Sequence, residues 1–192
     1  MVPIINSSEA EQLLRHRQLR LIEAEKVVRP ILYAVRTRGD RAVLNYARVF
    51  DGLEGNSLKV PEERLQAAQR RLSPELRSAI KQAAQNIRAF ARLQLPSEKS
   101  VTLSPGLKVG QIVRPLDTVA AYIPGGRYPL PSTLLMTVIP AQVAGVRNIC
   151  VTCPRPTDVV LGVAATLKVN QVFQIGGAHA IAAFAYGTRT IP

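Results

Sequence analysis

The chain has 192 residues, 47% of them hydrophobic, and a mean hydropathy of +0.08, so it can build a packed core and is not expected to be disordered. Its formal net charge is +12, and the excess of Lys and Arg is spread over both halves of the chain. Such a surface can attract nucleic acid or anionic ligands, but aromatic residues are few and no basic run exceeds a pair. We therefore favour a solvated helix surface over a nucleic-acid interface.

The sequence carries no recognisable targeting or membrane signal. The first residues lack the basic region and long apolar core of a signal peptide. The most apolar stretch, Thr133–Val146, is too short to span a bilayer and contains Pro140 and Gln142. Two cysteines are too few for a disulfide framework. We expect a cytoplasmic protein that does not bind membranes.

The first hundred residues are predicted to be helical. Ser8 and Glu11 form a capping box that begins a short first helix. A second helix ends at Gly39, and Pro30 is expected to begin or kink it. Asp40 is expected to cap the helix that follows.

Two further helix starts are predicted, at Pro61 and at Ser73-Pro74, where a capping serine precedes a proline at the first helical position. The helix after Ser73 carries an apolar stripe at three- and four-residue spacing. The stripe consists of Leu76, Ile80, Ala83, Ile87, Phe90 and Ala91.

The character of the sequence changes between residues 96 and 117. Ser104-Pro105-Gly106 predicts a turn between two short strands, Val101–Leu103 and Lys108–Val113. We place a domain boundary near Pro115, which divides the chain into residues 1–115 and 116–192.

After Pro115 the pattern strand, turn, helix occurs three times with short links, which predicts a parallel α/β sheet. The predicted strands are Thr118–Ile123, Asn148–Thr152 and Gln171–Ile175. The predicted helices are Ser132–Val143, which Pro140 should kink or shorten, Thr157–Val169 and Ala178–Ala185. In such sheets small molecules bind at the carboxyl ends of the strands.

The first and third strands both lead into Gly-Gly turns, Gly125-Gly126 and Gly176-Gly177. A glycine-rich turn before a helix offers free N–H groups that suit a pyrophosphate. Neither turn has the spacing G-x-G-x-x-G of a dinucleotide-binding loop, and every α/β fold needs strand–helix turns. Both interpretations stay open at this point.

Cys150 and Cys153 form a C-x-x-C pattern, which occurs in redox pairs and zinc sites. Pro154 and Pro156 follow directly and delay any helix, and no second pair of Cys or His lies nearby. We favour a structural role for both cysteines.

The two histidines are interpreted differently. His16 lies in a basic segment and is expected at the surface, whereas His179 lies one turn into the helix after Gly176-Gly177 and is expected to face the ligand cleft. From its position alone, His179 can equally be a site residue or not. The acidic residues form no pair suited to acid–base chemistry: Asp117 precedes a strand, and Asp158 is expected to help cap a helix.

Two stretches resemble histidinol dehydrogenases. The first is Ala121-Tyr122-Ile123-Pro124-Gly125-Gly126 with Pro129–Met136 and Ile139-Pro140-Ala141, and the second is Phe173–Ala183 with Tyr186-Gly187-Thr188. Val35–Asp40 and Phe50-Asp51 also look like the N-terminal helices of that family. The resemblance spans nearly the whole chain and corresponds to the N-terminal half of the family.

The resemblance implies a zinc- and NAD-dependent enzyme that oxidises L-histidinol to L-histidine through the aldehyde, with two NAD⁺, in histidine biosynthesis. A related dehydrogenase acting on another polar alcohol is also compatible with it. Such enzymes are homodimers with two incomplete Rossmann-like domains. In these terms residues 1–115 are the helical N-terminal part of the first domain, and residues 116–192 are an incomplete Rossmann-like domain.

By resemblance, Tyr122 matches a tyrosine that contacts NAD, and His179 stands where the family has a glutamine that also contacts NAD. The family's zinc ligands and its proton-transferring Glu-His pair belong to a later segment, so no catalytic or metal-binding residue is assigned in this chain. We expect the 192-residue chain to be inactive alone. As an alternative, it is a non-catalytic assembly module whose apolar stripe, Leu76 to Ala91, lacks the sheet that would cover it.

Overall fold

The computed structural model describes residues 6–125 and 130–192, except for the side chains of residues 8, 9 and 12–19. A parallel sheet with the strand order β3-β4-β5 lies at its centre. Its strands are β3 (Thr118–Tyr122), β4 (Asn148–Thr152) and β5 (Gln171–Phe173). Val119 of β3 pairs with Ile149, and Val151 of β4 pairs with Val172 of β5. The predicted α/β class and the three parallel strands are therefore confirmed.

A helix follows each strand, as the sequence predicts. These helices are α5 (Pro131–Val143), α6 (Asp158–Thr166) and α7 (Gly177–Tyr186). Helix α5 contains Pro140 and still ends at the predicted residue, so the proline does not shorten it. Thr157 rather than Asp158 caps α6, because its side chain accepts a hydrogen bond from the backbone N–H of Val160.

Five helical segments precede the sheet. They are α1 (Ser7–Arg38), α2 (Asp40–Tyr46), the π-helical η1 (Ala47–Asp51), α3 (Glu62–Arg71) and α4 (Pro74–Leu93). The prediction of two separate helices before Gly39 is wrong, since α1 is one helix of 32 residues that passes through Pro30. Pro30 lies on an exposed face, where water can bond the carbonyl group that loses its helical partner.

Gly39 ends α1 with a φ of 51°, a left-handed conformation that favours glycine. The prediction that Asp40 caps the next helix is wrong, since Gly39 occupies the cap position. The carboxylate of Asp40 instead accepts hydrogen bonds from the hydroxyl group of Thr190, at 2.7 Å, and from its backbone N–H. Asp40 thereby ties the start of α2 to the segment after α7.

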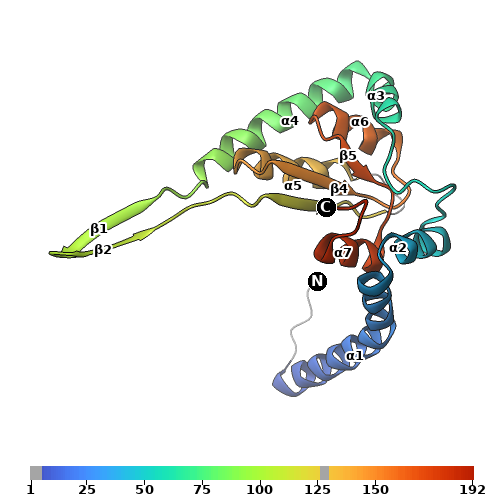
Figure 1. The fold of residues 1–192 in the computed structure, drawn as a ribbon, viewed down its shortest axis with the longest axis horizontal. Coiled ribbons are helices and arrows are strands. Elements are labelled where there is room, and N and C mark those ends of the chain that lie inside the picture. The colour runs from blue at the N-terminus through green and yellow to red at the C-terminus, as the bar shows by residue number, and fades with distance from the viewer. Residues whose placement is uncertain (1–5, 126–129) are drawn as a thin grey trace.

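Helices cover both faces of the sheet and build two hydrophobic clusters, as Figure 1 shows. Helices α3, α4, α5 and α6 contribute to one cluster, with Leu65, Ile80, Leu134 and Leu161 among its buried residues. Helices α1, α2 and α7 contribute to the other, together with Phe173 of the sheet. The first cluster draws residues from both sides of Pro115, and the boundary proposed there stays a prediction.

The apolar stripe of α4 is covered, contrary to the expectation that it would lack a partner. Ile80 and Ala91 are 4% and 7% exposed, and α4 packs against α5. Helix α5 thus covers the face of α4 for which we expected no covering sheet. Within the stripe, Phe90 is the exception at 63% exposure.

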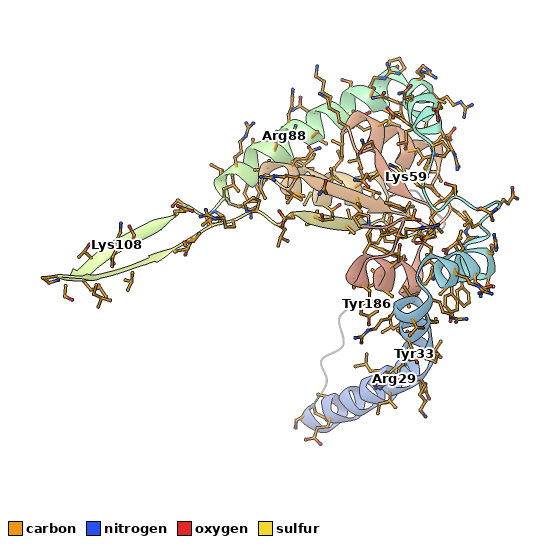
Figure 2. All side chains as sticks on the ribbon, viewed as in Figure 1. Arg29, Tyr33, Lys59, Arg88, Lys108 and Tyr186 are labelled. Carbon is orange, nitrogen blue, oxygen red and sulfur yellow. The ribbon has the colours of Figure 1, made fainter. Side chains whose placement is uncertain are left out.

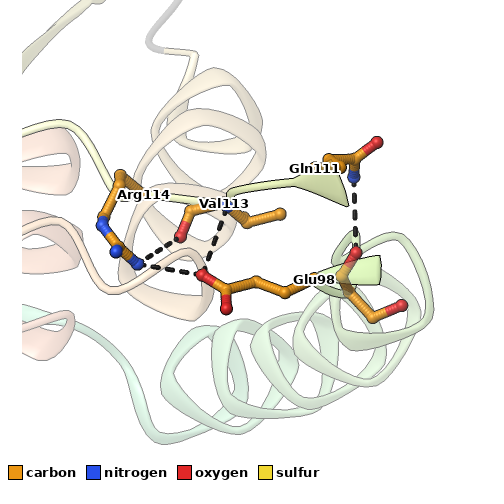
Figure 3. A network of polar contacts seen from close by, with 5 residues as sticks. Glu98, Gln111, Val113 and Arg114 are labelled. Carbon is orange, nitrogen blue, oxygen red and sulfur yellow. Dashed lines mark hydrogen bonds and ion pairs between the residues drawn. The ribbon is translucent and has the colours of Figure 1, made fainter. Parts of the chain in front are cut away.

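The predicted hairpin is confirmed and projects from the body as an arm (Figure 1). Its strands are β1 (Lys99–Ser104) and β2 (Leu107–Gln111), and Gly106 has a φ of 83° in the turn. Every residue of both strands is exposed. At the base of the arm, Glu98 accepts a hydrogen bond of 2.9 Å from Arg114 (Figure 3).

Side chains on α1 also point into solvent, as Figure 2 shows for Tyr33, which is 71% exposed. Among the described residues, no helix combines the length and the hydrophobicity that crossing a membrane requires.

Candidate functional site

The turns after the three strands converge on Pro154, which follows β4. A Cβ atom added to Gly125, after β3, would lie 2.8 Å from Cγ of Pro154. A Cβ atom added to Gly176, after β5, would lie 2.5 Å from the same atom. Both glycines are thus required by the close approach of the turns to the proline, whether or not a ligand binds there. Gly126, the second glycine of the first turn, lies outside the described residues.

A hydrogen bond joins the first turn to the second. The backbone N–H of Gly177 donates to the phenolic oxygen of Tyr122 at 3.0 Å. Tyr122 is half-buried and Gly177 is exposed, with a φ of 60° that favours glycine. Because this oxygen acts as an acceptor toward Gly177, its own O–H remains available to donate to a ligand. The two segments that carry the strongest family resemblance therefore meet at the carboxyl edge of the sheet.

His179 lies beneath this edge and is buried, with 1% of its surface exposed. Its Nε2 atom is 2.9 Å from Oδ2 of Asp51. The rings of Tyr46 and Phe50 lie tilted against the imidazole, with centroids 5.9 Å and 6.1 Å away. We expected His179 to face an open cleft, whereas its side chain lies inside the protein.

Asp51 is the residue of this region that sequence reasoning missed. It lies at the end of η1, and its Oδ2 atom accepts a hydrogen bond of 3.0 Å from the backbone N–H of Gly176 as well as contacting His179. The resemblance included Phe50-Asp51 but gave Asp51 no role. In the sequence, Asp51 is a carboxylate next to Gly52 at the end of a helical segment. This pattern does not indicate that Asp51 pairs with residues more than 120 positions away.

A cavity of about 420 Å³ lies beside Asp51, at the carboxyl ends of β4 and β5. It is lined by Asp51, Gly52, Leu53, Glu54, Arg64, Arg155, Pro156 and Gln174. Arg64 donates to the side-chain oxygen of Gln174 at 3.2 Å. Two arginines and two carboxylates thus give the cavity groups of both charges. Tyr122 and His179 do not line it, so Asp51 connects the cavity with the turns described above.

Cys150 and Cys153 are both buried free thiols and lie in different hydrophobic clusters, on the two faces of the sheet. Burial raises the pKa of Cys150, with a smaller opposing effect from the charge of Lys59. Burial raises the pKa of Cys153 to about 11. Thiols that stay protonated and point apart favour the structural role over a redox pair.

The described residues include no group of three or more His, Cys, Asp or Glu side chains that could hold a metal ion. Asp158 pairs with Arg71 at 2.8 Å on the surface. The side chain of His16 lies outside the described part of the chain.

Comparison with known proteins identifies the relatives of the chain. The family model described as histidinol dehydrogenase matches residues 14–192. The histidinol dehydrogenase of Methanosarcina barkeri is 46% identical over 192 residues, a match that covers 96% of this chain and 44% of that protein. The histidinol dehydrogenase of Deinococcus radiodurans is 44% identical over 196 residues, with 100% and 43% covered.

A solved structure gives the same result. The crystal structure of histidinol dehydrogenase from Elizabethkingia anophelis superposes with a TM-score of 0.81 at 31% identity, and the match covers 88% of this chain and 40% of that one. The chain thus spans less than half the length of the relatives that it matches.

Proposed function

The chain belongs to the histidinol dehydrogenase family, and we propose that it forms part of the NAD site of an enzyme that oxidises L-histidinol to L-histidine through the aldehyde. The observation that carries the proposal is the hydrogen bond between Gly177 and the hydroxyl group of Tyr122. It brings the two family motifs together at the edge of the sheet where α/β proteins bind ligands. When bound, NAD supplies the hydride acceptor.

The residues at this edge fit a cofactor to different degrees. Tyr122 is half-buried and has an O–H to donate, so it suits a direct contact. His179 has its Nδ1 atom buried without a hydrogen-bond partner among the described residues, and an unpaired buried polar atom is costly. A ligand that reaches this nitrogen would satisfy it. We therefore keep both Tyr122 and His179 as cofactor contacts.

Zinc is not assigned to this chain. The described residues offer no cluster of His, Cys, Asp or Glu side chains that could hold it. By resemblance, the zinc and proton-transfer residues belong to the part of the family that this chain does not match. We propose that the 192-residue chain alone does not turn over L-histidinol, and that the complete enzyme is a cytoplasmic homodimer that does not bind nucleic acid.

Calorimetric titration of the chain with NAD⁺ tests the cofactor site. We expect weak binding, with a dissociation constant on the order of 1 mM, because family contacts outside this chain are missing. Tyr122→Phe removes one hydrogen bond and should weaken binding about fivefold. His179→Gln restores the family's residue and should strengthen binding. Tyr46→Phe serves as control, because it also removes a tyrosine hydroxyl group, but not the one that contacts Gly177.

Two outcomes would count against the proposal. If Tyr122→Phe binds NAD⁺ as the parent chain does, the edge beside Gly177 is not the cofactor site. If His179→Gln changes nothing, position 179 does not contact the cofactor. Oxidation of L-histidinol by the purified chain would contradict the proposed inactivity.

An assembly role is the second candidate function, and the exposed apolar side chains of α1 and the hairpin favour it. Leu21, Val27 and Tyr33 on α1 are 63%, 67% and 71% exposed. Leu103 and Ile112 of the hairpin region are 62% and 72% exposed. Light scattering after gel filtration tests this role. A dimer or a larger species supports this role. A monodisperse monomer at a chain concentration of about 100 µM contradicts it.

A further inference from the structure

Asp51 and His179 form a buried pair that connects two distant parts of the chain. Their side chains are 8% and 1% exposed, and Nε2 of His179 lies 2.9 Å from Oδ2 of Asp51. The same oxygen accepts the backbone N–H of Gly176 at 3.0 Å. One carboxylate of η1 therefore holds both the turn after β5 and the first turn of α7.

We propose that Asp51 is a positioning residue that keeps the imidazole of His179 in the tautomer protonated on Nε2. A carboxylate oxygen can only accept hydrogen bonds, so the ring nitrogen that faces it must carry the proton. A neutral imidazole has one N–H, so Nδ1 is left with a lone pair and acts as an acceptor. The rings of Tyr46 and Phe50 fix the plane of the imidazole.

The position of Nδ1 indicates where a ligand could meet the acceptor that this tautomer provides. The atom has no hydrogen-bond partner among the described residues. A Cβ atom added to Gly177 would lie 3.7 Å from it, and Gly177 itself is exposed. Nδ1 therefore lies directly beneath an exposed turn that has no side chain, next to the hydrogen bond between Gly177 and Tyr122.

The tautomer of His179 determines which kind of ligand group can bind beside Gly177, and this step rests on the proposed function. The glutamine that the family has at this position can both donate and accept through its amide. His179 held by Asp51 offers only an acceptor. The ligand group that approaches Gly177 must therefore be a hydrogen-bond donor, such as a hydroxyl or amino group, and not a phosphate or carboxylate oxygen.

Nitrogen-15 NMR of the imidazole rings tests the tautomer without any ligand. The chain has two histidines, and His16→Gln leaves the signals of His179 alone. At pH 8 we expect Nε2 to show the shift of a protonated nitrogen and Nδ1 that of an unprotonated one. The reverse tautomer, an averaged pair of shifts or two protonated nitrogens would overturn the proposal.

Asp51→Ala tests whether Asp51 sets this preference, because alanine offers His179 no acceptor. We expect mixed tautomers of His179 in this variant. Asp51→Asn is the conservative control. Oδ2 of Asp51 faces both Gly176 and His179, so an amide oxygen in its place accepts from both and should keep the tautomer protonated on Nε2. Asp158→Asn, which removes a surface carboxylate, should leave the His179 shifts unchanged. Unchanged shifts in Asp51→Ala would show that the surrounding fold, and not Asp51, sets the tautomer.

NAD⁺ titration of the same variants separates this inference from the proposed function. If the parent chain binds NAD⁺, Asp51→Ala should weaken binding about fivefold, the effect of one lost hydrogen bond. Equal binding by the parent chain and Asp51→Ala would overturn the role of Asp51 in positioning the site. If the parent chain binds no NAD⁺, the cofactor proposal fails, while the NMR shifts still decide the tautomer.

Discussion

At the residue scale, the site is built by short contacts between segments that lie far apart in the sequence. Gly177 bonds the hydroxyl group of Tyr122, Asp51 holds Gly176 and His179, and Pro154 fills the space that two glycines leave. The strands themselves only bring these residues to one edge. Even small side-chain changes at these contacts should therefore lower the stability of the fold.

Gly176→Ala should destabilise the fold by about 1–3 kcal/mol, because its Cβ would lie 2.5 Å from Cγ of Pro154. Urea denaturation measures this change. In the double variant with Pro154→Ala, the loss should be smaller than the sum of the two single losses, since Cγ and Cδ, two of the three clashing atoms, are removed. Additive losses would show that the crowding at Pro154 is not the cause.

Asp40 should make the stability of the fold depend on pH in the acid range. Burial by itself raises the pKa of the Asp40 carboxyl, but hydrogen bonds from Thr188 and Thr190 and the charge of Arg189 outweigh it, so the pKa is lowered from its ordinary value of 3.8. A carboxyl whose pKa is lower in the folded state stabilises the fold above the unfolded pKa. This contribution is lost as the pH falls through the folded value.

Thermal melts of the parent chain and Asp40→Asn measure this contribution. The difference in Tm should be largest near pH 6 and should shrink below about pH 4. Asp158→Asn, which breaks an ion pair whose side chains are 70% and 49% exposed, should have little effect on Tm. A difference between parent and Asp40→Asn that does not change with pH would contradict the assignment.

At the scale of elements, local signals predicted the helices and strands well where capping and periodicity agree. The start of α4 at Ser73-Pro74, the hairpin around Gly106 and the three parallel strands all follow from their own residues. The sequence did not predict the single helix α1, because a proline usually begins or kinks a helix, whereas the exposed face of α1 tolerates Pro30. Local patterns do not show whether water can replace a lost hydrogen bond.

The cap of α4 is one place where the element depends on one side chain. Ser73 accepts a hydrogen bond of 3.2 Å from the backbone N–H of Leu76, so Ser73→Ala should lower the free energy of unfolding by about 1 kcal/mol. Ser78→Ala, at an exposed position inside the same helix, should not lower it, because alanine is the better helix former. Equal losses in the two variants would show that the cap does not stabilise α4.

At the scale of the whole molecule, the sequence indicated the fold class and the family but not the tertiary contacts of the site. The sequence motifs indicated Tyr122 and His179. They did not indicate how His179 packs, because its partner Asp51 lies in an N-terminal helix. The covered stripe of α4 was missed for the same reason, since no local pattern shows that α5 packs on it. The position of Asp51 depends on how η1 packs against the turn after β5.

The body also carries two projecting elements, α1 and the hairpin, and several apolar side chains of each lie in solvent (Figure 2). The chain spans less than half of the relatives that it matches. The proposed cofactor site on the sheet edge and the exposed apolar side chains of α1 and the hairpin can be tested separately.

The most direct test of the account is an amide NMR titration of the chain with NAD⁺. We predict that shifts change first at residues 122–125 and 174–180, and that Tyr122→Phe reduces these changes without altering the spectrum elsewhere. Changes confined to the hairpin or to α4, or none at millimolar NAD⁺, would contradict a cofactor site at the meeting of the two turns.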